Sequence, residues 1–547
     1  MSFGESWLND HSRQFLSRGY LSEGETPEDR IKEIAHTAEK YLDYPGFAAK
    51  FLEYMDAGYY SLASPIWANF GKKRALPISC FNSFIDDSVE SILHTVGEVS
   101  MMSKTGGGTS GYFGELRPAG APISSGGFSD GPMSFMRAFD TCVDVFKQGA
   151  TRRGSFAAYM PIDHPDIMSF LQIRQEGCPV QQVFPGVCVK DAWLEQMISG
   201  DQEKQAIWRE VLSSRIKTGT PYIFFHDNVN RNKPACYEHM DILSSNLCTE
   251  VLLPSNIYES FVCCLSSMNL LRYDEWVKTD AVRILTFFLD AVLTEFIEKA
   301  HDIPYMGRAV EFARNHRAIG IGALGWHSLL QSKMIPVESL EAQFLNKEIF
   351  MEIRSRSLEA SKELGVMLGC PEICAAYGLR NSALMAIAPT TSSSFILGQI
   401  SQSTELWRSN YYTKDLAKDK FVFKNPFLDR LLDEKPVDKT VVWKSILEHD
   451  GSVMHLDCLT DHEKNVFKTF SEVSQKELII QAAQRQKFID QGQSLNMMVH
   501  PSHTLKEINQ LVLFAWEQGI KTLYYQHSIN GAQDFYRSLS ACTSCEA

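Results

Sequence analysis

Three side chains that could act in one reaction stand at alternate positions in residues 244–250 (SSNLCTE). In an extended chain successive side chains point to opposite sides, so Asn246, Cys248 and Glu250 would share one side. An amide holds a polar group of a substrate, a thiol reacts at sulfur, and a carboxylate moves a proton. The alternative is a strand with one buried cysteine, because free cysteine is among the most buried residue types. The rest of the chain decides between these readings.

A second pair of thiols lies in the apolar run 261–265 (FVCCL), which predicts a buried strand. Cys263 and Cys264 are adjacent, so they point to opposite faces of that strand. At most one of them can therefore face the same cavity as Cys248.

Two glycine-bounded loops have the composition of anion sites. Residues 104–114 (KTGGGTSGYFG) contain five glycines, which let backbone amides approach a ligand closely. Residues 148–154 (QGATRRG) add two guanidinium groups, which suit an anion. A glycine-rich loop alone is a weak signal, and a solvated basic turn is an equally good reading of the second loop.

A third candidate anion site follows residues 383–388 (ALMAIA), which predict a buried strand leading into residues 389–394 (PTTSSS) and a helix. Hydroxyls and amides at the start of a helix favour an anion. The alternative is a Ser/Thr-rich cap with no ligand, although the run of hydroxyl residues is longer than one cap requires.

Local patterns indicate an α/β fold. Apolar spacing predicts helices over residues 27–58, 89–102, 201–217 and 280–300. The helix over 89–102 is preceded by Asp86, Asp87 and Ser88, which supply capping oxygens. Residues 475–525 predict a β-α-β unit: a helix over 475–490 precedes a strand at 494–499, and a helix with a Thr504/Glu507 capping box leads to a strand at 520–525. Such a unit favours parallel strands.

Composition excludes several classes of function. The 547 residues carry a formal net charge of −13, which argues against a protein that coats nucleic acid. The first ten residues lack the features of a secretory signal. The most apolar segment, 284–297, is interrupted by Asp290 and Glu295 and is too short to span a bilayer. We therefore expect a cytoplasmic protein that acts without a membrane or nucleic acid.

The 13 cysteines follow no short disulfide framework. In a reducing compartment such cysteines are core thiols, metal ligands or catalytic groups. Seven of them suggest only packing: Cys142, Cys178, Cys188, Cys236, Cys370, Cys374 and Cys458.

Six motifs in order resemble those of one family. They are PISC (77–80), NLCTE (246–250), VCCLSSMNL (262–270), PTTSSS (389–394), LYYQ (523–526) and a terminal CTSC (542–545). Together they are similar to the large, catalytic subunit of class I ribonucleotide reductases, from about Tyr59 to the C-terminus. Each motif alone is modest, but six in order make an accidental match improbable.

The resemblance implies a ten-stranded α/β barrel of two antiparallel five-stranded halves, with Cys248 on a loop through its centre. It divides the chain into an N-terminal helical region (1–75), the first part of the barrel with effector loops (76–350), a C-terminal α/β region (351–525) and a redox tail (526–547). Many large subunits begin with an ATP-cone domain. Too little chain precedes Tyr59 to hold one, so we expect no overall-activity site in this chain.

The resemblance also implies a chemistry, the reduction of ribonucleoside diphosphates to 2'-deoxyribonucleoside diphosphates. Cys248 would become a thiyl radical that removes the 3'-hydrogen, Glu250 would take the 3'-hydroxyl proton, and Asn246 would bind the sugar hydroxyls. Cys80 and Cys263 would supply two electrons and finish as a disulfide, which is the oxidation that a dithiol undergoes.

Further positions match the family's binding sites. Those that would contact substrate or its phosphates are Ser64, Ser79, Gly108, Pro389, Thr390, Thr391, Ser392 and Ser393. Asp87, Arg117 and Arg152 match the specificity-effector site, where a deoxynucleoside triphosphate or ATP binds, with Mg²⁺ expected beside it.

The resemblance implies partners. Tyr524 and Tyr525 would relay an electron and proton between Cys248 and a radical on a separate small subunit; the alternative is that they pack. The chain shows no obvious ligand set for its own radical-generating metal and no covalent cofactor. Cys542 and Cys545 would pass oxidation from the internal disulfide to thioredoxin or glutaredoxin, since no second Cys-x-x-Cys pair completes a zinc site. A homodimer is expected.

Two other functions remain open at this point. An adenosylcobalamin-dependent reductase has a similar trio of cysteines, although the tyrosine pair argues against it. A catalytically silent nucleotide-binding regulator of the same fold would have no need of all of Cys80, Asn246, Cys248, Glu250 and Cys263.

Overall fold

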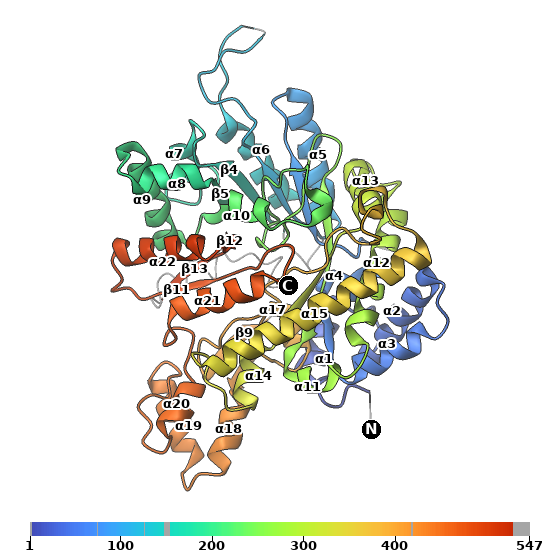
Figure 1. Ribbon diagram of the computed structural model, residues 1–547, viewed down its shortest axis with the longest axis vertical. Helices are drawn as coiled ribbons and strands as arrows, with labels where there is room; N and C mark the ends of the chain where they lie inside the picture. Colours follow the sequence, from blue (N-terminus) through green and yellow to red (C-terminus); the bar gives the residue numbers. More distant parts are fainter. Residues whose placement is uncertain (1–2, 74, 125, 147–153, 417–418, 529–547) are drawn as a thin grey trace.

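A mixed sheet of nine strands organises the computed structural model, which describes residues 3–73, 75–124, 126–146, 154–416 and 419–528 (Figure 1). The strand order is β1-β7-β2-β3-β4-β5-β6-β12, and β8 also pairs with β7. The strands are β1 Tyr60–Leu62, β2 Cys80–Phe84, β3 Gly108–Tyr112, β4 Phe156–Pro161, β5 Val183–Val189, β6 Tyr222–Phe225, β7 Phe261–Asn269, β8 Ile319–Leu324 and β12 Thr522–Leu523.

The sheet contains three antiparallel pairs. Strands β2 to β6 are parallel to one another, as are β7 and β8, whereas β7 is antiparallel to both β1 and β2, and β6 is antiparallel to β12. Beyond β8, isolated parallel bridges join Ile321 to Met385 and Ile387 to Gln493. The expected α/β barrel is thus present as a curled sheet, although the expected strand at 383–388 contributes only these bridges in the described residues.

Helices surround the sheet (Figure 1). The longer ones are α2 Pro27–Leu42, α3 Phe47–Asp56, α5 Val89–Lys104, α6 Pro132–Val145, α9 Gln202–Thr218, α12 Ala281–Ala300, α13 Gly307–His316, α15 Leu340–Leu368, α19 Lys439–Glu448, α21 Gln475–Gln486 and α22 Leu505–Glu517. The shorter ones are α1 Asp10–Ser17, α4 Ser64–Asn69, α7 Ile167–Phe170, α8 Asp191–Ile198, α10 His226–Arg231, α11 Tyr273–Trp276, α14 Trp326–Ser332, α16 Glu372–Ala375, α17 Thr391–Ile396, α18 Pro426–Asp433 and α20 Asp461–Val466. Two further pairs of strands, β9 Tyr411–Leu416 with β10 Asp419–Lys424 and β11 Met497–Val499 with β13 Gln526–Ser528, lie outside the main sheet.

Helix α12 is the apolar segment that two carboxylates interrupt, and both carboxylates are paired. Asp290 accepts from Arg317 Nε at 2.7 Å, and Glu295 accepts from Lys299 Nζ at 2.5 Å. Buried carboxylates require such partners. None of the described helices is both long enough and apolar enough to cross a membrane.

Local signals predicted most elements correctly. Ser88 caps α5 by accepting from Ser91 N, and the Thr504/Glu507 capping box begins α22. The strand predicted at 520–525 is β12, which pairs antiparallel with β6 and not with the strand at 494–499. The parallel partner of β11 is β13, which begins just after the predicted strand. One expected helix, residues 27–58, is instead two, because Asp43 adopts φ 47° and ends α2.

Candidate active site

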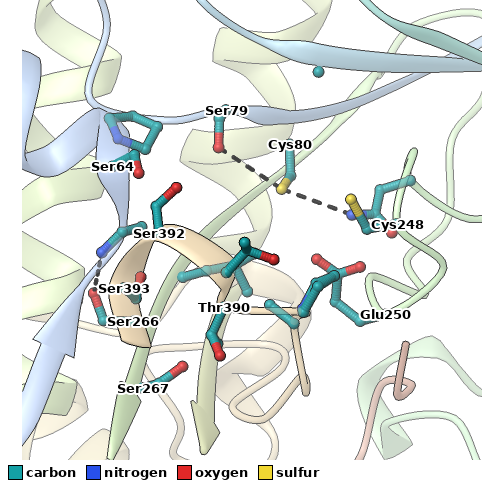
Figure 2. Close-up of a pocket in the computed structure, with 18 of the residues that line it drawn as sticks. Ser64, Ser79, Cys80, Cys248, Glu250, Ser266, Ser267, Thr390, Ser392 and Ser393 are labelled. Carbon is teal, nitrogen blue, oxygen red and sulfur yellow. Dashed lines mark hydrogen bonds between the residues drawn. The ribbon is translucent and has the colours of Figure 1, made fainter. Parts of the chain in front are cut away.

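A pocket of ≈ 680 Å³, partly open to solvent, gathers most of the predicted site residues. Figure 2 shows hydroxyl groups toward one end, and Cys80, Cys248 and Glu250 toward the other. The predicted residues in its lining are Ser64, Ser79, Cys80, Gly108, Asn246, Cys248, Glu250, Pro389, Thr390, Thr391, Ser392 and Ser393. Residues from six separate parts of the chain therefore line one cavity.

The loop that carries Cys248 is a tight turn, as the resemblance implied, and not the extended segment that the alternation of side chains suggested. Thr249 has φ 70°, and Val251 N donates back to Asn246 Oδ1 at 3.0 Å. Tyr159 on β4 donates from its hydroxyl to Asn246 O at 2.8 Å and thereby fixes the loop inside the barrel. The turn still presents Asn246, Cys248 and Glu250 to the same pocket.

Glu250 is held in a state that suits proton transfer near neutral pH. It is 1% exposed, and burial raises its pKa to about 7, although hydrogen bonds, including one from Ser494, oppose the rise. Ser494 Oγ lies 3.1 Å from Glu250 Oε2 and 2.5 Å from Cys248 O, so its one proton can be donated to either oxygen. A carboxyl whose pKa is near the working pH is suited to act as a general base.

Cys80 and Cys263 are directly opposed partners across the antiparallel pair β2 and β7. Opposed residues in such a pair have Cα atoms about 4.5 to 5.5 Å apart, a separation that a disulfide tolerates. Asn246 Nδ2 donates to Cys80 Sγ at 3.7 Å, which ties this cysteine to the Cys248 loop. Cys264 points away and pairs with Ile319 on β8, as the alternation in a strand predicted.

The hydroxyl end of the pocket is built around the start of α17. Thr390 has φ 55°, and its Oγ1 accepts from Ser403 N at 2.7 Å. Ser393 is fixed to β1 in both directions, because Ser61 Oγ donates to its carbonyl at 2.9 Å and its own hydroxyl donates to Leu62 O at 3.2 Å. Amides in the first turn of a helix point outward along the axis, so this end is suited to phosphate.

The two tyrosines predicted to transfer a radical lie beside the Cys248 loop. The ring centroids of Tyr524 and Tyr525 are 4.3 Å apart, and Tyr222 on β6 lies 4.9 Å from the first and 5.2 Å from the second. Tyr524 belongs to the same buried cluster as Cys248, and Tyr525 packs against that cluster.

Two of the predicted effector residues, Asp87 and Arg117, are not in the lining of this pocket. Asp87 Oδ2 accepts from Arg117 Nε at 2.6 Å, and Arg117 Nη1 also donates to Pro122 O. Arg152, Cys542 and Cys545 lie outside the described residues. Within the described ranges, no three His, Cys, Asp or Glu side chains are grouped to hold a metal ion.

Several residues at this site were not predicted from the sequence. Ser266 and Ser267 line the pocket, and both belong to the motif VCCLSSMNL (262–270) that contains Cys263. Tyr159 and Ser494 support the Cys248 loop from distant parts of the chain, and no local pattern marks either of them.

Comparisons with known proteins agree with this geometry. The family model "Ribonucleotide reductase, barrel domain" matches residues 78–205, 201–373 and 369–526. The ribonucleoside-diphosphate reductase large subunit of Invertebrate iridescent virus 3 is 35% identical, with 94% of this chain and 93% of the relative covered. The putative large subunit of Frog virus 3 is 34% identical, with 93% and 94% covered. The solved α subunit of the Actinobacillus ureae class Id ribonucleotide reductase is 52% identical, with a TM-score of 0.92 and coverage of 97% of this chain and 99% of that one. This chain belongs to the family of ribonucleotide reductase large subunits.

Proposed function

We propose that this chain is the catalytic subunit of a ribonucleoside-diphosphate reductase. The observation that carries the proposal is the single pocket with a hydroxyl-rich helix start at one end and Cys80, Cys248 and Glu250 at the other. A nucleoside diphosphate has the matching chemistry, an anionic diphosphate joined to a sugar.

In this proposal each residue of the pocket has its own role in the reaction. Cys248, as a thiyl radical, takes the 3'-hydrogen atom, while Glu250 accepts the 3'-hydroxyl proton and Asn246 binds a sugar hydroxyl. The 2'-hydroxyl leaves as water. Cys80 and Cys263 supply the two electrons and become a disulfide, and Cys248 then returns the hydrogen atom to C3'.

The proposal includes partners. A separate small subunit supplies the radical, which passes through Tyr525 and Tyr524, and the Cys542/Cys545 tail exchanges with thioredoxin or glutaredoxin. Asp87, Arg117 and Arg152 contribute to a site for a deoxynucleoside triphosphate or ATP with Mg²⁺, in a homodimer. The similarity to a class Id α subunit favours this arrangement over an adenosylcobalamin-dependent enzyme.

The test is reduction of CDP by the full chain with its cognate small subunit and a dithiol. We expect Cys248→Ser to abolish turnover. Cys188→Ser is the matched control, since Cys188 is buried in the same cluster but donates to Leu243 O outside the pocket lining. Equal turnover by Cys248→Ser and the parent would refute the radical role, and turnover with adenosylcobalamin in place of the small subunit would reverse the choice of partner.

A further inference from the structure

The two sulfurs of the opposed pair have different environments. Cys80 lines the pocket, whereas Cys263 is 1% exposed and lies outside the pocket lining. An incoming thiol that enters through the pocket therefore reaches Cys80 first. In thiol-disulfide exchange, the sulfur that is not attacked departs as a thiolate, and the reaction is slower when that thiolate is poorly stabilised.

The departing sulfur would be Cys263, whose surroundings oppose a negative charge. Burial raises the pKa of the Cys263 thiol well above its ordinary value, and the neighbouring Cys80 and Cys264 add to the rise. One side chain acts in the other direction. Gln491 Nε2 donates to Cys263 Sγ at 3.8 Å and to Ile319 O at 2.9 Å.

Gln491 is held rigidly in this position. Its side chain is buried, and its backbone N–H donates to Met385 O at 3.2 Å. Lys521, itself buried, donates from Nζ to Gln491 O at 2.9 Å and to Asp490 O at 2.8 Å. The Asp490 carboxylate in turn accepts from Leu384 N at 2.9 Å. The amide is therefore fixed against the sulfur before any charge develops, which is the condition for effective electrostatic stabilisation.

We propose that Gln491 stabilises Cys263 as the leaving thiolate when the Cys80–Cys263 disulfide is reduced again between turnovers. This inference depends on the dithiol role in the proposed function. An external dithiol attacks Cys80 Sγ as a thiolate, the Cys80–Cys263 bond breaks, and its electron pair stays on Cys263. The second thiol of the reductant then releases Cys80 and closes the reductant's own disulfide. The two protons of the reductant end on Cys80 and Cys263.

The test separates the two halves of the catalytic cycle. Full-length chains carrying C542S and C545S are used, so that dithiothreitol is the sole dithiol. Each reduced chain first converts CDP in a single turnover with the small subunit and no external reductant. Peptide mapping then locates the disulfide, and its reduction by dithiothreitol is followed by timed alkylation.

Gln491→Met keeps the length of the side chain and removes the donor. We expect the same amount of single-turnover product as in the parent, with re-reduction slower by about tenfold. Gln481→Met is the matched control, because Gln481 is equally buried and donates to Val337 O at 2.7 Å, away from the cysteines. Its re-reduction should match that of the parent. When a monothiol replaces dithiothreitol, the mixed disulfide that it forms should be found on Cys80.

The possible results are distinguishable. Equal re-reduction rates in Gln491→Met and the parent, or a mixed disulfide on Cys263, would overturn the inference while the proposed function stands. A loss of single-turnover product in Gln491→Met would indicate a structural role for Gln491 and would also overturn the inference. The exception is a result in which Gln491→Glu, which keeps the shape of the side chain, restores the product and still slows re-reduction. Absence of a Cys80–Cys263 disulfide in the parent would instead overturn the dithiol role in the proposed function, and this inference with it.

Discussion

Cys80 and Cys263 face each other across the antiparallel seam between β2 and β7, and of these two cysteines Cys80 lines the pocket. The seam is where the parallel strands β2 to β6 meet the strand that leads to β8. The Cys248 loop reaches the same place, since Asn246 Nδ2 donates to Cys80 Sγ. The seam thus brings two thiols from distant segments within reach of a third.

The first prediction concerns this pair. Cys80→Ser or Cys263→Ser should lower turnover with a dithiol on the order of a thousandfold, as removal of an essential reacting group does. Cys264→Ser is the control, because Cys264 is as buried as Cys263 but points to the opposite face of the same strand and does not line the pocket. Steady-state CDP reduction measures the effect, and full activity of Cys263→Ser would contradict the assignment of the pair.

The second prediction concerns the cost in stability of keeping Glu250 buried. Its pKa rises from 4.5 in the unfolded chain to about 7 in the folded one, so the folded state retains a proton that the unfolded state releases. The free energy of unfolding therefore falls as pH rises from 4.5 to 7, and above pH 7 the total loss is about 3 kcal/mol. Glu250→Gln should remove this cost, and its free energy of unfolding should exceed that of the parent at pH 8 but hardly at pH 4.5.

Glu259 provides a control, because its pKa is shifted in the opposite direction from that of Glu250. Burial alone would raise the pKa of Glu259, but a hydrogen bond and charge from His316, 3.1 Å away, lower it. Glu259→Gln should therefore lower stability at pH 6, as measured by denaturant unfolding. If Glu250→Gln and Glu259→Gln change stability in the same direction at pH 6, the explanation from ionisation is wrong.

The third prediction concerns Tyr159, whose hydroxyl holds the Cys248 loop through Asn246 O. Tyr159→Phe removes the shorter of two hydrogen bonds to this buried carbonyl, the other being from Thr249 N at 3.3 Å, which costs about 1 kcal/mol. Because the loop carries the reacting groups, kcat should fall about tenfold. Tyr237→Phe loses a comparable buried hydrogen bond to Ser382 Oγ outside the pocket lining, so it should lower Tm without lowering kcat. Equal kcat values in the two variants would separate Tyr159 from catalysis.

Local signals in the sequence predicted local structure well and the loop at residues 246–250 poorly. Ser88, Thr504 and Glu507 act within one helical turn, so the sequence contains all that their caps require. Alternation along residues 246–250 suggested a strand, but the turn depends on Tyr159 from β4.

The pocket residues were predicted mainly from motifs, whereas their supports were not. Motifs name the residues at the reacting centre, and the structure brings twelve of the predicted ones into one lining. Gln491 and Ser494 are ordinary polar residues in sequence, and their partners Cys263 and Cys248 lie 228 and 246 positions away. Such relationships depend on the closure of the barrel and leave no periodic pattern.

The fourth prediction concerns Ser494 and the pH dependence of turnover. Glu250 must be ionised to accept a proton, so kcat should rise with pH through an apparent pKa of about 7. The Ser494 hydroxyl is one of the groups that oppose the rise in that pKa. Ser494→Ala should therefore move the rising limb about one unit higher, because a hydrogen bond to a charged group is lost. Thr522→Ala, which removes a hydroxyl that donates to Thr249 O in the same loop, should leave the limb in place. An unmoved limb in Ser494→Ala would show that another group controls the profile.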